Sequence, residues 1–176
     1  GLVLVRAGKE NEDFKVSSME AICNDESIDA VAEVMGGVEP AFTYVSMALK
    51  AGKHVVTSNK ALVAAKGVEL NKIALENNVS FLFSAACGGA VPFLHNLSIA
   101  TLDDEIESLG GILNGTTNFM LDSMQSEGMD YAEALSIAQK LGYAEANPST
   151  DVEGIDTWHK IILSANIAFG VSLDRD

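Results

Sequence analysis

The stretch IDAVAEVMGGVEPAFTYVSMALKAGKHVVTSNK, residues 28–60, sets the fold class of this chain. Residues 28–35 are mostly apolar and predict a buried strand. A helix should follow, with Pro40 at its first position, where proline is well tolerated, and Gly52 as its left-handed cap. Residues 54–57 predict a second strand directly after that cap. A strand–helix–strand unit of this kind predicts two parallel strands joined by a right-handed crossover.

The same alternation extends on both sides of this stretch. Ser58 or Asn59 is expected to cap a helix over residues 60–77. A third strand is expected at residues 80–83, and an apolar strand opens the chain at residues 1–7. Alternating strands and helices predict an α/β fold with a parallel sheet.

Ligands of open parallel sheets bind at the edge where the carboxyl ends of the strands meet. This rule places Gly36-Gly37, residues 57–60 and residues 85–89 along one edge. Lys60 in this set could meet a cofactor or a carbonyl oxygen, or could simply be a solvated residue of a first helical turn. Its positive charge opposes the helix dipole there, which favours a role beyond the helix itself.

The pattern changes after Gly89, and we interpret residues 91–176 as a second, mixed α+β domain that follows a first domain of residues 1–90. The elements expected in the second domain are helices at 91–100, 115–126, 130–141 and 154–169, and a strand at 106–113.

The charge of the chain excludes two classes of partner. Lys and Arg number 11 against 25 Asp and Glu, giving a net charge of −14. Nucleic acids and anionic lipids both need a basic surface, so neither is an expected partner. No apolar run reaches the length of a membrane span. The two cysteines, Cys23 and Cys87, lie far apart in no metal-binding spacing, which suits a reducing, cytoplasmic compartment.

The last predicted helix carries the most informative pair of charges. Asp156 and Lys160 stand at i and i+4 on one helix face, with Leu163 and Ile167 further along the same side. A surface ion pair at this spacing contributes only about 0.3–0.5 kcal/mol. The alternative is a partly desolvated lysine, held by its acidic partner, that donates or relays a proton. Glu145 lies just upstream and could add a second carboxylate, or could be a solvated loop residue.

Glycine and small hydroxyl residues supply further candidate binding segments. Gly110-Gly111 and residues 114–118 (NGTTN) could cradle an anion or a carboxylate at a helix start, although a structural turn explains each nearly as well. Cys87 is expected to be a small buried residue rather than a nucleophile, because no base can be placed beside it. No His and Cys cluster indicates zinc.

Four segments in this chain resemble homoserine dehydrogenases and occur in that family's order. They are residues 48–60 (ALKAGKHVVTSNK), 111–119 (GILNGTTNF), 138–145 (AQKLGYAE) and 151–160 (DVEGIDTWHK). The first alone is weak, because other dinucleotide-dependent dehydrogenases share its AGKHV form, whereas the last three together are specific.

The resemblance implies an NAD- or NADP-dependent enzyme that interconverts L-homoserine and L-aspartate 4-semialdehyde on the route to threonine, methionine and isoleucine. It implies an incomplete Rossmann-type sheet followed by a catalytic and dimerisation domain. The roles it assigns are proton transfer to Lys160, catalytic assistance and cofactor contact to Lys60, homoserine binding to Glu145 and Asp156, and cofactor contact to Gly36 and Gly142.

Two departures from the family pattern affect these expectations. The family usually has glutamate where this chain has Ser84, within a sodium-binding loop that would continue through the backbone of Cys87, Gly89 and Val91. The dinucleotide fingerprint G-x-G-x-x-G is absent from the sequence. We therefore expect the chain to be a fragment whose first strand and glycine turn precede Gly1, and which by itself does not turn over homoserine.

Two other functions stay open on the sequence alone. One is an oxidoreductase of the glucose–fructose oxidoreductase type, which shares AGKHV but has Glu-Lys-Pro where this chain has residues 58–61 (SNKA). The other is a non-catalytic module for dimerisation and substrate binding. A homodimer is expected from the second domain, paired through the apolar side chains of the predicted strand at residues 106–113, which are Ile106, Leu109, Ile112 and Leu113.

Overall fold

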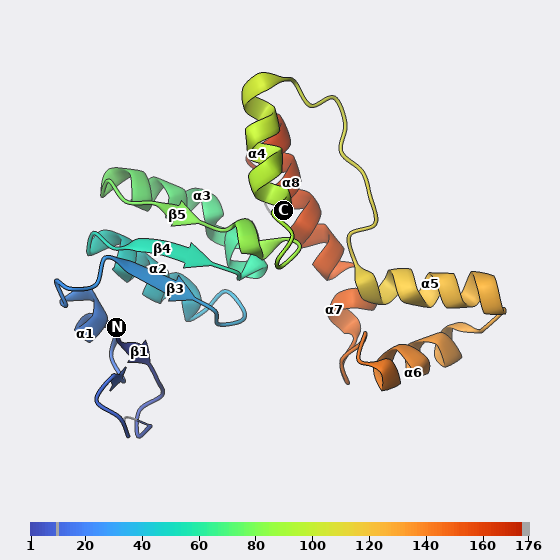
Figure 1. The fold of residues 1–176 in the computed structure, drawn as a ribbon, viewed down its shortest axis with the longest axis horizontal. Coiled ribbons are helices and arrows are strands. Elements are labelled where there is room, and N and C mark those ends of the chain that lie inside the picture. Colours follow the sequence, from blue (N-terminus) through green and yellow to red (C-terminus); the bar gives the residue numbers. More distant parts are fainter. Residues whose placement is uncertain (10, 174–176) are drawn as a thin grey trace.

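A computed structural model describes residues 1–9 and 11–173 of the chain (Figure 1). A three-stranded sheet and its helices form one part, and two helices, at residues 93–103 and 155–169, stand beside it. The three helices at residues 115–152 form an arm that extends away from both. The elements in chain order are β1 (Val3–Leu4), β2 (Lys15–Val16), α1 (Met19–Cys23), β3 (Ala30–Glu33), α2 (Ala41–Lys50), β4 (His54–Thr57), α3 (Lys60–Glu76), β5 (Phe81–Leu82), the 3-10 helix η1 (Ser84–Ala86), α4 (Phe93–Asp103), α5 (Gly115–Glu127), α6 (Tyr131–Leu141), α7 (Ser149–Val152) and α8 (Ile155–Phe169).

The predicted parallel sheet is confirmed in the order β3-β4-β5, with Ala30 opposite His54 and Val55 opposite Phe81. The strand predicted at residues 28–35 is confirmed at Ala30–Glu33, but the prediction that it is buried is wrong. β3 is an edge strand, its side chains alternate between exposed and buried positions, and Val34 just beyond it is 79% exposed.

The opening strand is also confirmed, although it pairs in a separate sheet. β1 pairs in parallel with β2, which the sequence did not predict, and these two strands form a sheet of their own. β2 includes Lys15, and it does not lie in an apolar run like that around β1, so the sequence around it does not indicate a strand.

The helix boundaries follow the capping residues that the sequence offers. Asn59 caps α3 by accepting a hydrogen bond from the Leu62 N–H at 3.1 Å, and Asp130 caps α6 in the same way. Gly142 ends α6 in the left-handed conformation, with φ of 82°, as predicted. These local signals explain why the predicted and observed helices agree to within a few residues.

One hydrophobic core joins the sheet to helices from both halves of the chain. Leu49 of α2 and Leu62 of α3 are fully buried, and Leu94 of α4 and Leu163 of α8 belong to the same cluster. The arm has a smaller cluster of its own, made of Met120, Ala134, Ala138 and Ala144. The predicted domain boundary between residues 90 and 91 stays a prediction, and residues 174–176 of the predicted second domain lie outside the described residues.

The predicted strand at residues 106–113 is wrong. These residues form an irregular connection between α4 and α5, and in the part of the chain that the structure describes they pair with no other strand. The apolar residues Ile106, Leu109 and Ile112 recur at every third position rather than at every second, so the pattern does not favour a strand, and a strand also needs a partner backbone. Ile112 is consequently 78% exposed.

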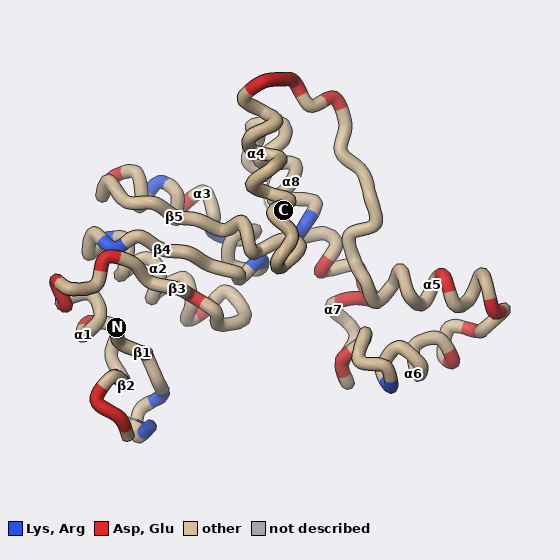
Figure 2. Tube along the Cα trace, in the orientation of Figure 1, with Lys and Arg blue, Asp and Glu red and all other residues tan. Residues whose placement is uncertain are grey.

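Acidic residues are spread over the whole fold, as Figure 2 shows, with a short run of three, Asp103, Asp104 and Glu105, at the start of the α4–α5 connection. Among the described residues, no helix is both long and apolar enough to cross a membrane.

Candidate active site

The site is built around Asp156, which lies in the first turn of α8 and has a side chain only 5% exposed. Its carboxylate forms ion pairs with Lys60, the first residue of α3, and with Lys160 of α8 at 2.7 Å. Two lysines from distant parts of the sequence therefore share one carboxylate. This contact explains why a positive charge stands at the start of α3, where the helix dipole opposes it.

The surroundings of Asp156 keep it ionised. Burial by itself raises the pKa of this carboxyl, but hydrogen bonds from Lys160, Lys60 and Asn114 together lower it by more than burial raises it. The resulting pKa is about 2, below the usual 3.8. At neutral pH the site therefore holds a permanent negative charge between two cationic side chains.

Lys160 is held at two points and has a donor to spare. Its Nζ donates to Asp156 and, at 2.6 Å, to the backbone carbonyl of Leu113. An ammonium has three N–H donors, so a third can reach a bound ligand. The side chain of Lys160 is 20% exposed, which permits such access, and Lys60 is 36% exposed.

Asn114 and Asp151 lie next to this group; the sequence offered Asn114 only as part of a candidate anion-binding segment, and it assigned no role to Asp151. Asn114 caps α5, and its Nδ2 donates to Asp151 at 2.8 Å and to Asp156 at 2.9 Å. The hydroxyl of Thr116 lies 3.0 Å from the other Asp151 oxygen. The NGTTN segment thus does hold carboxylates, but they are the protein's own. An asparagine in a capping position with a free amide is the signal that could have indicated this.

Hydrogen bonds between polar groups connect the ends of the strands at the sheet edge beside Lys60. Thr57 donates to the buried carboxylate of Glu33, and Asn59 Nδ2 donates to the Gly37 carbonyl at 2.6 Å. The carboxyl ends of β3 and β4 therefore meet beside the start of α3, as the sequence predicts. Gly36 is exposed at this edge, and a Cβ added to it would have no heavy atom within 4 Å.

Cys87, which follows η1, is also close to the lysine pair. Burial raises the pKa of its thiol to about 11, while the charges of Lys160 and Lys60 act in the opposite direction. The side chain is 2% exposed. Cys87 is therefore a small buried residue, as expected, and its thiol is protonated at neutral pH.

Two predicted site residues lie apart from this cluster. Glu145 is exposed in the connection between α6 and α7, where its carbonyl accepts from Gln139 at 3.1 Å, and the ion pairs found among the described residues do not include it. Gly142 is exposed at the end of α6. The structure thus brings together Lys60, Asp156 and Lys160, and leaves Glu145 outside their contacts.

The face of α8 was predicted correctly on the side of the site. Leu163 is buried in the main core and Ile167 packs against it. On the opposite side, Ile161 is 37% and Phe169 44% exposed.

The loop that the resemblance assigns to sodium is a tight backbone turn. The Val91 N–H donates to the Gly88 carbonyl at 3.0 Å, and the Val91 carbonyl accepts from Phe93 at 2.8 Å. Within residues 1–9 and 11–173, no group of three or more His, Cys, Asp or Glu residues gathers to hold a metal ion. The backbone sodium site at Cys87, Gly89 and Val91 remains a prediction.

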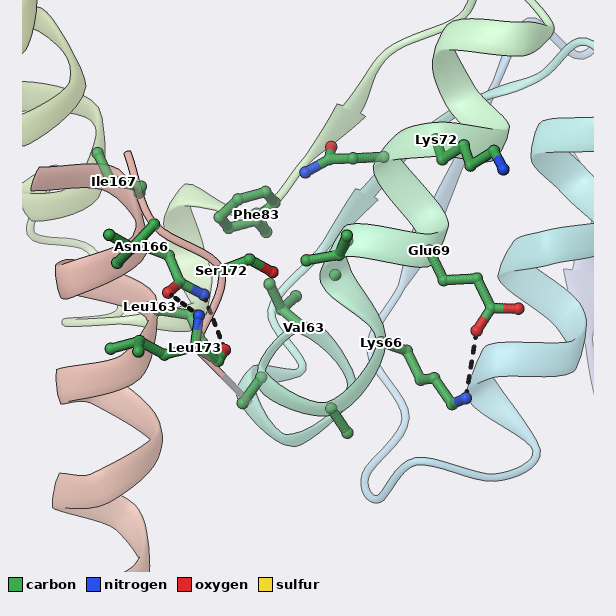
Figure 3. Close-up of a pocket in the computed structure, with 16 residues that line it drawn as sticks. Val63, Lys66, Glu69, Lys72, Phe83, Leu163, Asn166, Ile167, Ser172 and Leu173 are labelled. Atoms are coloured by element: carbon green, nitrogen blue, oxygen red, sulfur yellow. Dashed lines mark hydrogen bonds and ion pairs between the residues drawn. The ribbon is translucent and has the colours of Figure 1, made fainter. Parts of the chain in front are cut away.

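A pocket of about 530 Å³ lies between α3 and the end of α8, and the side chains of the lysine–aspartate cluster do not line it (Figure 3). Its wall is largely apolar, with an exposed Lys66–Glu69 pair at 3.2 Å and Asn166 hydrogen-bonded to Leu173. Exposed i,i+3 pairs are common and weak. The buried carboxylate with its two lysines is therefore the better candidate for chemistry.

Comparison with known protein families gives two matches that together cover most of the chain. A model described as the NAD binding domain of homoserine dehydrogenase matches residues 5–84, and a model described as homoserine dehydrogenase matches residues 92–176.

Individual relatives carry the same description. The chain is 44% identical over 171 residues to a homoserine dehydrogenase from Lactococcus lactis, covering 97% of this chain and 40% of that protein. It is 49% identical over 156 residues to one from Corynebacterium glutamicum, covering 89% and 35%.

Solved structures agree in fold. A homoserine dehydrogenase from Thiobacillus denitrificans superposes with a TM-score of 0.84 at 43% identity, covering 89% of this chain and 36% of that one. A hyperthermophilic archaeal homoserine dehydrogenase in complex with NADPH gives 0.80 at 30% identity, covering 88% and 48%. The chain spans about 40% of the length of the curated relatives that it matches.

Proposed function

Because this chain belongs to the homoserine dehydrogenase family, we propose that it carries the catalytic lysines of a protein that interconverts L-homoserine and L-aspartate 4-semialdehyde with NAD or NADP. The observation that supports this proposal most is the buried Asp156 carboxylate shared by Lys60 and Lys160. Oxidation of an alcohol needs a base for the hydroxyl proton, and an amine held beside a permanent carboxylate can supply it.

Lys160 is the proposed proton acceptor when homoserine is oxidised, and the donor in the reverse direction. In its neutral amine form, Lys160 keeps two N–H donors for Asp156 and Leu113, and its lone pair would take the proton from the C4 hydroxyl as the carbonyl forms. Asp156 would then hold the resulting ammonium in place. The Leu113 carbonyl, 2.6 Å from Nζ, fixes the direction of approach. The hydride leaves the same carbon, and a bound nicotinamide would accept it.

The carboxyl edge of the sheet fits the nicotinamide end of such a cofactor. Gly36 leaves open space there, and the first turn of α3 presents backbone N–H groups beside it. Lys60 stands between this edge and Asp156, so it would lie between cofactor and substrate. Gly142 is proposed as a further cofactor contact. Parallel assays with NAD and with NADP would determine which cofactor the protein prefers.

Asp156 and Glu145 are the proposed partners of the substrate's polar groups. Asp156 is fixed by its hydrogen bonds, whereas Glu145 lies in an exposed loop from which its carboxylate would meet the ammonium of homoserine. In the cell the reaction would serve threonine, methionine and isoleucine biosynthesis in the cytoplasm.

A homodimer is the proposed assembly. Residues 106–113 carry apolar side chains at Ile106, Leu109, Ile112 and Leu113 and are unpaired in the described chain, and Ile112 is 78% exposed. A second copy would supply the covering surface that this segment lacks. Light scattering that gives a monomer at every protein concentration would contradict this assembly.

The activity is tested with the full-length protein by following nicotinamide absorbance during incubation with L-homoserine and either NAD or NADP. Reduction of one or both cofactors is the expected result. Turnover of a sugar instead, with homoserine inert, would favour the glucose–fructose oxidoreductase type. If neither homoserine nor a sugar leads to cofactor reduction, the proposed substrate class is contradicted.

A further inference from the structure

The two oxygens of the Asp156 carboxylate serve different lysines. Oδ1 faces Lys60, and Oδ2 lies 2.7 Å from the Nζ of Lys160. The terminal torsion of an aspartate is broad and roughly two-fold, so its own rotamer does not fix the plane of the carboxylate. A third group must set this rotation if each oxygen is to keep its lysine.

Asn114 supplies that third group, and its own orientation is determined by α5. Its Oδ1 accepts from the N–H of Thr117 at 2.8 Å and from the Thr117 hydroxyl at 2.9 Å. The Nδ2 group must then point the other way, where it donates to Oδ2 of Asp156 at 2.9 Å and to Asp151 at 2.8 Å. Both donors of the amide are thereby used, in a side chain that is buried.

The residue before Asn114 holds the partner of Asp156. The Leu113 carbonyl accepts from Lys160 at 2.6 Å, so two consecutive residues grip both members of the i,i+4 pair on α8. We propose that Asn114 is a positioning residue, which orients the Asp156 carboxylate so that Lys60 and Lys160 each keep one oxygen. The consequence for catalysis rests on the proposed function, whereas the orientation itself does not.

Asn114 also caps α5, and the two roles can be separated by substitution. Serine and aspartate cap a helix as well as asparagine does. Asn114→Ser keeps a capping oxygen and removes the amide donor without adding charge. Asn114→Asp also removes the donor and adds a negative charge beside two carboxylates. Asp130→Ser is the matched control, since it changes the exposed cap of α6, and Figure 1 shows the start of α6 far from α3 and α8, which carry Lys60 and Lys160.

The main measurement is a carbon-13 NMR titration of the Asp156 carboxyl in the 176-residue chain. The charged and titratable groups that face this carboxyl are Lys60 of α3, Lys160 of α8, Asp151 of α7 and Cys87 after η1. In the unchanged chain the pKa should be about 2. Asn114→Ser should raise it toward the usual 3.8, Asn114→Asp should raise it more, and Asp130→Ser should leave it unchanged.

A second measurement needs no substitution. In the unchanged chain, the side-chain amide protons of Asn114 should shift as Asp156 titrates, because Nδ2 donates directly to its carboxylate. If these protons do not respond, or if the pKa of Asp156 is the same in a folded Asn114 variant, the positioning role is refuted. This measurement decides the question even if both variants fail to fold.

Kinetics of the full-length protein separates this inference from the proposed function. Asn114→Ser should lower kcat for homoserine oxidation about 10- to 100-fold, with a smaller change in KM, because misplacing a reacting group costs rate. A shifted pKa in a protein that never oxidises homoserine would support the positioning role and refute the function. Normal oxidation with an unshifted pKa and an unchanged kcat would refute the positioning role alone.

Discussion

Replacing Asp156 by asparagine should change how the stability of the chain depends on pH. Asparagine has the shape of a protonated aspartate, so the variant should resemble the native chain at a pH where Asp156 has lost its charge. The native pKa of this carboxyl is about 2, against 3.8 for the ordinary group. At about 1.4 kcal/mol per unit, this difference corresponds to a stabilisation of about 2 kcal/mol in the ionised state.

The direction of the effect follows from the lowered pKa. The stabilisation is fully present above the unfolded value of 3.8 and is lost as pH falls through the folded value of about 2. Asp156→Asn should therefore lower the free energy of unfolding by about 2 kcal/mol at pH 7 and by almost nothing in strong acid. A buried lysine left without its partner costs about 3–5 kcal/mol, but Lys60 and Lys160 are 36% and 20% exposed and can recover hydration.

Urea denaturation followed by far-UV circular dichroism across the acid range measures this difference. Asp122→Asn is the matched control, because Asp122 is exposed on α5 and accepts only a 3.3 Å hydrogen bond from Ser126. The control should follow the native pH dependence closely. A constant gap between Asp156→Asn and the native chain at every pH would show that ionisation of Asp156 does not stabilise the fold.

Four further outcomes are expected. In the full-length protein, Lys160→Ala should lower kcat about 10²- to 10⁴-fold, with far less effect on homoserine affinity. The exposed control Lys72→Ala should leave kcat unchanged. If steady-state kinetics shows an unchanged kcat for Lys160→Ala, Lys160 has no part in the mechanism. Glu145→Ala should raise KM for homoserine strongly, and an unaltered KM would show that its carboxylate stays away from the substrate. Burial raises the pKa of the Cys87 thiol to about 11, so a thiol reagent near neutral pH should label Cys87 only after unfolding, as mass spectrometry would show. Gly142→Ala should destabilise the chain by about 1–2 kcal/mol because φ is 82° there, and a thermal melt equal to that of the native chain would refute this strain.

The elements that could be predicted are those whose signals are local. α3 and α6 begin at Asn59 and Asp130 because these side chains bond to backbone N–H groups three residues away. The helices α1 and α7 escaped prediction because five and four residues are too few to show a hydrophobic period. β2 escaped because it does not lie in an apolar run like those around the equally short β1 and β5. The strand expected at residues 106–113 failed because its apolar residues are spaced three apart rather than two, and because pairing depends on another segment.

The site divides along the same line. Asp156 and Lys160 could be paired from their spacing, because a helix brings positions four apart together. The contact between Lys60 and Asp156 depends on how α8 packs against α3, and no local pattern encodes it. Asn114 was predicted only as part of a segment that could hold an anion or form a turn, since its amide contacts Asp151 and Asp156 through tertiary structure alone.

The helical arm of α5, α6 and α7 has few means of resisting local opening. Figure 1 shows it projecting from the rest of the fold, and its buried cluster contains three alanines and one methionine. The larger side chains that pack against this cluster, such as Phe119 and Leu135, are only partly buried. The arm therefore has a smaller core than the sheet region, and its amide protons should exchange with solvent through openings that leave the sheet intact. Asn114 and Asp151 are anchored in this arm. Each transient opening would therefore release Asp156 from its amide donor while α3 and α8 stay folded. The orientation of Asp156 toward Lys60 and Lys160 would then last only as long as the arm stays closed.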